Sequence, residues 1–116
     1  NNKLTMVDLN LFNLSIDKDA KEILHEGDAN FFVGIESVGG RLFLTKDTLI
    51  FHSNGITLSR VNKLTEIQLN EINRIKKHNF LGLITNGIKV YTNLKTYKFV
   101  VSNRKRWIEK INSVTH

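Results

Sequence analysis

The sequence predicts a mainly β fold (β-rich α+β), a bent antiparallel β-barrel or sandwich of about seven strands capped by a C-terminal α-helix. Two patterns support this class. From residue 22 to residue 101, short apolar runs are separated by polar turns, as in a meander of antiparallel strands. After that, apolar residues recur at the spacing of an amphipathic helix. The chain has 116 residues, enough for one domain with its own core.

The first 21 residues differ from the domain expected over residues 22–116. The stretch LTMVDLNLFNLSI (4–16) fits a slipped strand alternation and also a helical stripe, and periodicity leaves the two open. We expect this apolar N-terminal segment, residues 1–21, to pack on the domain or on a partner. If the partner is a second copy of the chain, the two copies exchange this segment and form a homodimer.

The first predicted strand is DANFFVGIES (28–37), and Gly39-Gly40 supplies the turn after it. A hairpin follows, with RLFLT and TLIFHS on either side of Lys46-Asp47. Asn54-Gly55 is the exit turn, because both residues tolerate positive φ. ESVGGR is then the connection between the first two strands.

Alternation within this hairpin puts apolar residues on both faces. Leu42 and Leu44 point to one side, as strand geometry requires. Phe43 and Ile50 lie on the second face. Large apolar residues at these positions indicate that this face is not open to solvent. We expect the N-terminal segment to cover that face.

Four more short runs are predicted as strands: KLTEIQL (63–69), INRIKKH (72–78), GIKVYT (87–92) and KTYKFVV (95–101). The helix is predicted at about 103–114, with Ser102 or Asn103 as its N-cap. Its apolar stripe consists of Trp107, Ile108, Ile111 and Val114.

Four stretches of the chain resemble the GRAM domain, a family within the pleckstrin-homology (PH)-like superfold. They are AKEILHEGDANF (20–31), VGGRLFLTKDTLIFHS (38–53), IQLNEINRIKK (67–77) and GIKVYTNLKTYKFVV with RWIEKI (87–111). The resemblance covers residues 22–114, and its most diagnostic part is the central stretch. It implies a PH-like barrel with a closing helix and a non-catalytic binding module.

The sequence contains no recognisable catalytic motif. The four histidines stand singly in different segments, and there is no cysteine. A glycine-rich phosphate loop and a nucleophile elbow are also absent. We therefore expect no enzyme activity, no cofactor and no metal. The lack of cysteine fits a cytoplasmic protein. Binding to a membrane surface would make it peripheral there. The Asn, Lys and Ile content fits an AT-rich bacterial genome.

Positive charge is concentrated in the second part of the chain. Residues 1–36 hold three lysines against seven acidic residues, whereas residues 37–116 hold 14 basic against four acidic residues. Neighbouring strands would bring several cations together as a candidate surface for anionic partners. The alternative is a set of ordinary solvated charges. The candidate residues are Arg74, Lys76, Lys77, Lys89 and Lys98.

An apolar stretch, NFLGLITNG (79–87), follows these basic residues. It is a candidate membrane or partner loop, with an apolar tip inside a cationic collar. The commoner arrangement is an extra strand or core-covering loop that turns at Asn86-Gly87. The candidate loop residues are Phe80, Leu81, Leu83 and Ile84.

The function predicted from these features is non-catalytic binding, to an anionic membrane surface or to a protein partner. The connection ESVGGR has a single cation, Arg41, and so lacks the Lys/Arg loop of phosphoinositide-binding pleckstrin domains. The alternative is a nucleic-acid-associated protein that uses its positive face. It ranks lower, because aromatic and basic residues do not interleave repeatedly along the strands.

Overall fold

A computed structural model describes residues 22–54, 63–80 and 84–115 of the chain. The elements, in order, are β1 (His25–Val33), β2 (Glu36–Leu44), β3 (Thr48–Ser53), β4 (Leu64–Gln68), η1 (Leu69–Glu71), β5 (Ile72–Phe80), β6 (Ile84–Thr92), β7 (Thr96–Val101) and α2 (Arg104–Val114). The sequence prediction of seven strands and a C-terminal helix is confirmed.

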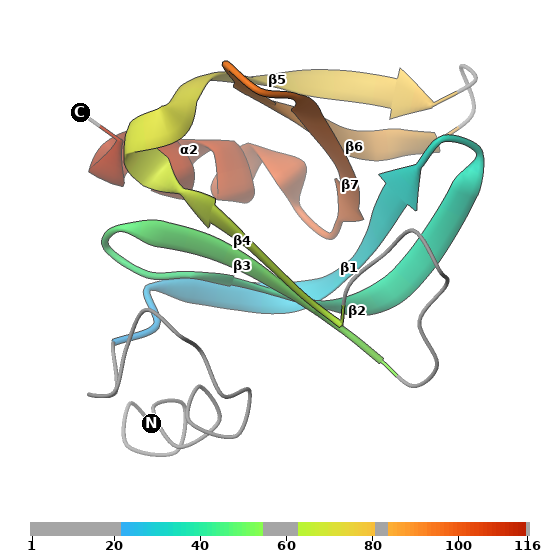
Figure 1. The fold of residues 1–116 in the computed structure, drawn as a ribbon, viewed down its shortest axis with the longest axis horizontal. Coiled ribbons are helices and arrows are strands. Elements are labelled where there is room, and N and C mark those ends of the chain that lie inside the picture. Colours follow the sequence, from blue (N-terminus) through green and yellow to red (C-terminus); the bar gives the residue numbers. More distant parts are fainter. Residues whose placement is uncertain (1–21, 55–62, 81–83, 116) are drawn as a thin grey trace.

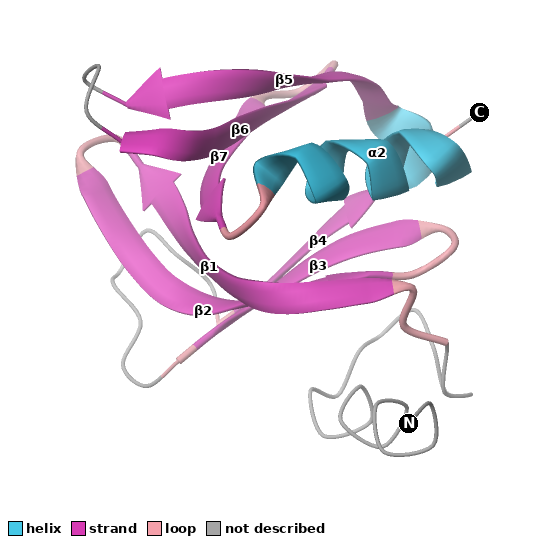
Figure 2. Ribbon diagram, turned by 180° about the vertical axis from the view of Figure 1, so that it is seen from behind, coloured by secondary structure: helices cyan, strands magenta, loops and turns pink. Residues whose placement is uncertain are grey.

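The seven strands form one antiparallel sheet in the order β4-β3-β2-β1-β7-β6-β5. The sheet curls into a half-barrel, with β1 to β4 on one side and β5 to β7 on the other (Figure 1). Helix α2 packs against β5, β6 and β7 and closes the open side of the curl (Figure 2). This arrangement is the bent, capped barrel that the alternation of short strands predicts.

The core lies inside the curl and is centred on aromatic residues. The Phe31 ring stacks on the Phe99 ring at 5.0 Å between centroids, and the Phe51 ring lies 5.5 Å from that of Phe31. Trp107 and Ile111 of α2 are buried among them. Burial of such side chains, at roughly 25 cal/mol per Å² of apolar surface, is the main term that holds the helix on the sheet.

Asn103 starts the helix, as predicted. Its backbone is left-handed, with φ of 56°, and its side-chain oxygen accepts a hydrogen bond from the Arg106 amide at 3.3 Å. Asparagine tolerates this conformation better than most residues and satisfies one of the free amides of the first turn. The chain therefore turns sharply from β7 into α2.

Two predicted glycine turns are wrong. Strand β1 ends at Val33, and the first turn is Gly34-Ile35, where Gly34 has φ of 64°. Gly39 and Gly40 lie within β2 instead, in continuous register with β1. A Cβ on Gly40 would collide with the His52 carbonyl and the Phe51 ring, so this glycine permits close packing.

The predicted turn at Asn86-Gly87 is wrong for the same reason. β6 begins at Ile84, so both residues lie inside the strand, and β5 continues to Phe80. A Cβ on Gly87 would collide with the His78 carbonyl and the Phe80 ring. The glycine is needed for close approach between neighbouring strands, and the β5–β6 connection falls at residues 81–83, outside the described residues.

A second apolar cluster lies on the outer face of β2 and β3. Phe43 and Ile50 are buried there, and Ile23 and Leu64 pack against them. The structure therefore confirms that the hairpin has a second apolar face, and the side chains of Phe43 and Ile50 on it are buried. The N-terminal segment that we expect over it, residues 1–21, lies outside the described residues, as does Gly55 of the predicted exit turn.

Candidate functional site on the outer face of the sheet

Three lysines form a row across neighbouring strands. Lys76 of β5 lies opposite Lys89 of β6, which lies opposite Lys98 of β7. Of their chain neighbours, Val90 and Phe99 are buried in the core and Ile75 packs against it, so alternation directs the three lysines to the outer face. We call these three residues the lysine row.

The lysine row is an unneutralised concentration of charge. Like charges directly opposite one another destabilise a sheet. Within the described ranges, none of the three has an acidic side chain at ion-pair distance; the ion pairs there join Arg41 to Glu26 and to Asp28. A bound anionic surface would relieve this repulsion.

The other two predicted cations take different positions. Arg74 faces the same side as the lysine row, and its guanidinium carbon lies 4.5 Å from the ring centroid of Tyr91, a cation–π arrangement. Lys77 lies opposite Ile88, which is fully buried, so it is on the other face of β5. The fold thus brings four of the five predicted cations to one face and separates Lys77 from them.

Beside the lysine row lies an aromatic pair, Phe32 and Phe80. Their rings stack at 4.4 Å between centroids with 20° between planes. The His78 ring contacts Phe80 edge-on at 4.5 Å. Phe32 is opposite Lys98 in the register, which joins the aromatic pair directly to the lysine row. Sequence analysis missed Phe32, although the double aromatic Phe31-Phe32 already puts one ring on each face of the strand.

A pocket of about 290 Å³ opens at this place, between the β1–β2 turn and the ends of β5 and β6. Ile35 at its rim is 98% exposed and Ile84 is 40% exposed. Of the predicted apolar loop, Phe80 and Ile84 thus reach the pocket, while Leu81 and Leu83 lie outside the described residues. The lining consists of Phe32, Gly34, Ile35, His78, Phe80, Ile84 and Lys98.

The charges of the row act on His78. Partial burial, followed by the positive charges of Lys89 and Lys98, lowers the pKa of His78 below its ordinary value of 6.5. The imidazole is therefore neutral at neutral pH and adds polar surface without adding charge.

Arg104, at the start of α2, connects the helix to β5 and β6 beside the pocket. Its Nη1 donates to the His78 carbonyl at 3.2 Å, to Asn79 Oδ1 at 2.9 Å and to the Gly87 carbonyl at 3.3 Å. A guanidinium can satisfy several acceptors at once, so the helix start, β5 and β6 are fixed relative to one another.

The β1–β2 connection itself supplies no cation. It is Gly34-Ile35, so the predicted connection ESVGGR is wrong and Arg41 lies within β2. Arg41 donates to Glu26 and Asp28, each at 3.0 Å. The basic character of the candidate site therefore comes from the strand faces.

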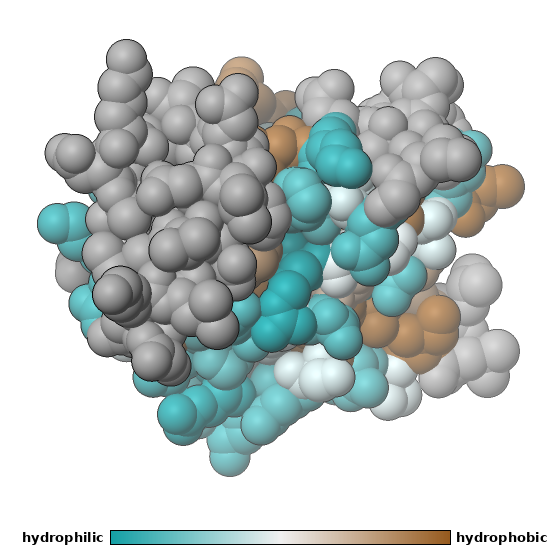
Figure 3. Space-filling view, turned by 90° about the horizontal axis from the view of Figure 1, so that it is seen from below, coloured by the Kyte–Doolittle hydropathy of each residue, from teal (hydrophilic) through white to brown (hydrophobic). Residues whose placement is uncertain are grey.

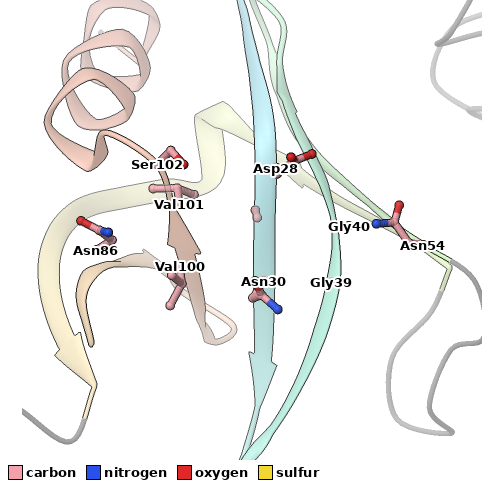
Figure 4. Close-up of a pocket in the computed structure, with 10 residues that line it drawn as sticks. Asp28, Asn30, Gly39, Gly40, Asn54, Asn86, Val100, Val101 and Ser102 are labelled. Atoms are coloured by element: carbon pink, nitrogen blue, oxygen red, sulfur yellow. The ribbon is translucent and has the colours of Figure 1, made fainter. Parts of the chain in front are cut away.

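A second pocket, of about 360 Å³, is polar (Figure 4). It includes Asp28 and Asn30 of β1, Asn86 of β6, and Ser102, which follows β7. Lysine and arginine are absent from the described residues that line it, and the Asp28 carboxylate there is paired with the Arg41 guanidinium. Of the described residues, no three His, Asp or Glu side chains gather as metal ligands.

Figure 3 shows the molecule from below the view of Figure 1. Hydrophilic residues fill the middle of this face, and apolar residues reach the surface at its right and along its upper part. None of the helices in the described part of the chain is long and apolar enough to span a membrane.

The fold is that of a PH-like domain. The C-terminal domain of an unknown protein from Leishmania infantum matches with a TM-score of 0.71 and 21% identity, over 97% of this chain and 93% of that chain. The human ARAP2 N-terminal PH domain matches with a TM-score of 0.60 and 14% identity, over 78% of this chain and 77% of that one.

The DH/PH fragment of p115-RhoGEF (R399E mutant) also matches, with a TM-score of 0.68 and 16% identity over 87% of this chain. The match spans only 32% of that fragment. A search of curated proteins gives no match. The GRAM domain model matches residues 13–112, so the chain belongs to the GRAM domain family. GRAM and PH-like domains are generally non-catalytic binding modules.

Proposed function

We propose that this domain is a non-catalytic adaptor that docks on an anionic membrane surface through the outer face of β5, β6 and β7. The observation that carries the proposal is the lysine row, Lys76, Lys89 and Lys98, in direct cross-strand register. Arg74 extends the same face. Each such cation near an anionic bilayer contributes about 1 kcal/mol, so the four together give a weak, salt-sensitive attachment.

Protein partners are the second candidate, and one neighbour favours them. A solved structure of the PDZ-RhoGEF DH/PH domains, 16% identical to this chain, is a complex with activated RhoA. A protein partner of this chain would need acidic side chains to meet the lysine row. We favour the membrane because the row lies on an open strand face, which suits a diffuse anionic surface.

Nucleic acid is a weaker candidate than either. Base stacking needs an aromatic ring with a free face. Phe32 and Phe80 each have one ring face against the other, and Tyr91 has the Arg74 guanidinium over its ring, so few ring faces on this surface are left for bases. A peripheral cytoplasmic location and a bacterial source remain part of the proposal, on the compositional grounds given above.

Co-sedimentation with phosphatidylcholine vesicles of increasing phosphatidylserine content tests the proposal. The triple variant Lys76→Gln, Lys89→Gln, Lys98→Gln should bind such vesicles at least tenfold more weakly, since three contributions of about 1 kcal/mol are lost. The matched control removes three exposed lysines elsewhere, Lys46, Lys77 and Lys105, and should bind nearly as the parent does.

The parent should also release from vesicles as salt is raised, because screening weakens exposed charge interactions. Binding that ignores the phosphatidylserine content would rule the proposal out. Equal losses in the two triple variants would show that net charge, and not this face, is responsible.

A further inference from the structure

We propose that the polar pocket across β2, β1 and β7 is a binding site for a neutral, polyhydroxylated ligand, namely a sugar ring. The site is separate from the lysine row, so this inference goes beyond the proposed function and does not depend on it. Three observations on the described residues carry it. They are a set of polar side chains with unused hydrogen-bonding capacity, the balance of charge at the pocket, and a glycine that the fold itself does not require.

The first observation is the set of polar side chains around the pocket (Figure 4). They come from four segments that meet there: β1, the residue after β3, β6 and the residue after β7. Within the described ranges, none of these side chains makes a hydrogen bond, apart from the ion pair of Asp28. Their donors and acceptors are therefore available to a ligand. The five residues are Asp28, Asn30, Asn54, Asn86 and Ser102.

These groups match the hydroxyls of a sugar. An asparagine amide offers an acceptor oxygen and two N–H donors, a serine hydroxyl both donates and accepts, and a carboxylate oxygen accepts. A sugar hydroxyl also donates and accepts, so two neighbouring hydroxyls of a ring can bond the oxygen and the nitrogen of one amide. Three amides around one pocket can therefore hold several hydroxyls of a ring at once.

The second observation is that the charge at the pocket favours a neutral ligand. Asp28 is the only charged residue among the described residues that line it, and its Oδ1 accepts a hydrogen bond from Arg41 Nη1 at 3.0 Å. The pair has no net charge, so it attracts neither an anion nor a cation strongly. The second carboxylate oxygen, Oδ2, makes no hydrogen bond to a described residue and can accept one from a ligand hydroxyl.

The third observation is Gly39, which lies inside β2 although glycine weakens a strand. Packing explains the neighbouring Gly40, because a Cβ there would collide with the His52 carbonyl. At Gly39 the nearest atom to an added Cβ is Asn30 Nδ2, at 3.8 Å, and the backbone is not left-handed. Neither packing nor backbone geometry therefore requires this glycine. A strand glycine also marks places where a ligand approaches the backbone closely, and Gly39 lines the pocket.

The pocket has the size for a sugar ring and a floor that sets a modest affinity. Its volume of about 360 Å³ lies within the range of small-ligand pockets, which starts at roughly 300 Å³. The buried residues Ala29 and Val101 line it, and no aromatic ring does so among the described residues. Binding thus depends on hydrogen bonds, each of small net strength, and we expect a dissociation constant on the order of 1 mM.

NMR spectra of the backbone amides test the site. The probes are the methyl glycosides of glucose, galactose, mannose and N-acetylglucosamine, each titrated to about 50 mM, well above the expected dissociation constant. At least one of them should shift the amide resonances of Asn30, Gly39 and Ser102 in a saturable way and leave those of Lys76 and Lys89 unchanged. Sodium sulfate and tetramethylammonium chloride, the charged controls, should give no saturable shift at the pocket.

A free sugar and the terminal sugar of a glycan present the same hydroxyls to the pocket. A short oligosaccharide that ends in the sugar which binds distinguishes the two sources. Binding as tight as that of the methyl glycoside identifies a glycan end as a ligand that the pocket admits. Exclusion of the oligosaccharide identifies the free sugar as the ligand.

Variants locate the ligand. Gly39→Val puts a side chain into open space within the pocket and should abolish binding, while its urea unfolding should occur no earlier than that of the parent, because valine is favoured in strands. Asn30→Ala and Asn86→Ala each remove one exposed amide and should weaken binding about threefold to tenfold. Asn112→Ala makes the same change on the exposed side of α2 and should bind as the parent does.

Several results would overturn the proposal. If none of the four glycosides shifts the amides of the pocket, the site does not bind sugar. If a charged control saturates the pocket and the glycosides do not, the neutral ligand class is wrong. If Gly39→Val binds the glycoside as the parent does, the ligand lies elsewhere, and the two asparagine variants decide the same point should Gly39→Val not fold. Vesicle binding through the lysine row is measured separately, so none of these results bears on the proposed function.

Discussion

The ring of Phe32 on β1 stacks on the ring of Phe80 on β5, with 4.4 Å between centroids, although β7 and β6 lie between these strands in the sheet. The contact exists because Gly87 of β6 has no side chain, so the Phe80 ring lies across it. The aromatic pair thereby joins the two halves of the curled sheet and forms a wall of the pocket beside the lysine row.

Replacing Gly87 with alanine should break this contact. The added Cβ would meet the Phe80 ring and the His78 carbonyl, so the free energy of unfolding should fall by about 1–3 kcal/mol, as for an overpacked site. Urea unfolding followed by the fluorescence of Trp107 measures it. An alanine variant as stable as the parent would mean that Phe80 does not need the space above Gly87.

Two neighbouring glycines of β2 should respond in opposite ways. Gly40→Ala should destabilise the domain by about 2 kcal/mol, because its Cβ would meet the His52 carbonyl and the Phe51 ring. At Gly39 a Cβ would meet only Asn30 Nδ2, at 3.8 Å. Gly39→Ala should therefore be neutral or stabilising by about 0.5 kcal/mol. The same unfolding assay compares the pair, and equal effects would contradict the packing role of Gly40.

Stability should fall on mild acidification, partly because of His25. Its ring contacts Trp107 edge-on at 4.4 Å, and burial, then Lys110 and Arg106, lower its pKa below 6.5, against an opposing effect of Glu26. The unfolded chain therefore takes up the proton first as pH falls, so the free energy of unfolding decreases below about pH 6.5.

His25→Phe keeps a ring beside Trp107 and removes the titration, so it should make this pH dependence shallower. The substitution should not abolish the pH dependence, because burial also lowers the pKa values of His52 and His78. Denaturant titrations at about pH 7.5 and about pH 5.5, on either side of the unfolded histidine pKa, provide the measurement. If the free energy of unfolding changes between the two pH values by as much in His25→Phe as in the parent, this contribution of His25 is ruled out.

Membrane affinity should rise as pH falls from about 7 to about 5.5, through His78. In the free domain partial burial, and then the charges of Lys89 and Lys98, disfavour its protonation and lower its pKa. An anionic surface offsets the lysine charges and raises the pKa of His78, so binding takes up a proton. Vesicle sedimentation of His78→Gln should lose this pH response, whereas His52→Gln should keep it. A full response in His78→Gln would exclude the mechanism.

Deleting residues 1–16 should expose the outer cluster of β2 and β3. Phe43 and Ile50 are only 1% and 0% exposed, and we expect the N-terminal segment to contribute to their cover. The truncated chain should bind more of an apolar dye such as anilinonaphthalene sulfonate and unfold at lower denaturant concentration. Unchanged dye binding and stability would count against this role of the segment.

The elements that local chemistry specifies can be predicted from the amino-acid sequence alone. Alternation in RLFLT and TLIFHS predicts the β2–β3 hairpin and both of its apolar faces. Asn103 and the stripe through Trp107 and Ile111 likewise predict α2 within one residue of its start. These signals involve residues only a few positions apart, so they can be detected without knowing the rest of the fold.

Packing between distant strands settles which glycines turn the chain and which residues form the site. Gly34 turns, while Gly40 and Gly87 make room for backbone and rings that come from other strands. The lysine row likewise depends on the register of three strands, which puts Lys76 on its face and Lys77 off it. A shift of one residue would reverse these faces, and register is fixed by core packing between distant segments, which no local pattern encodes.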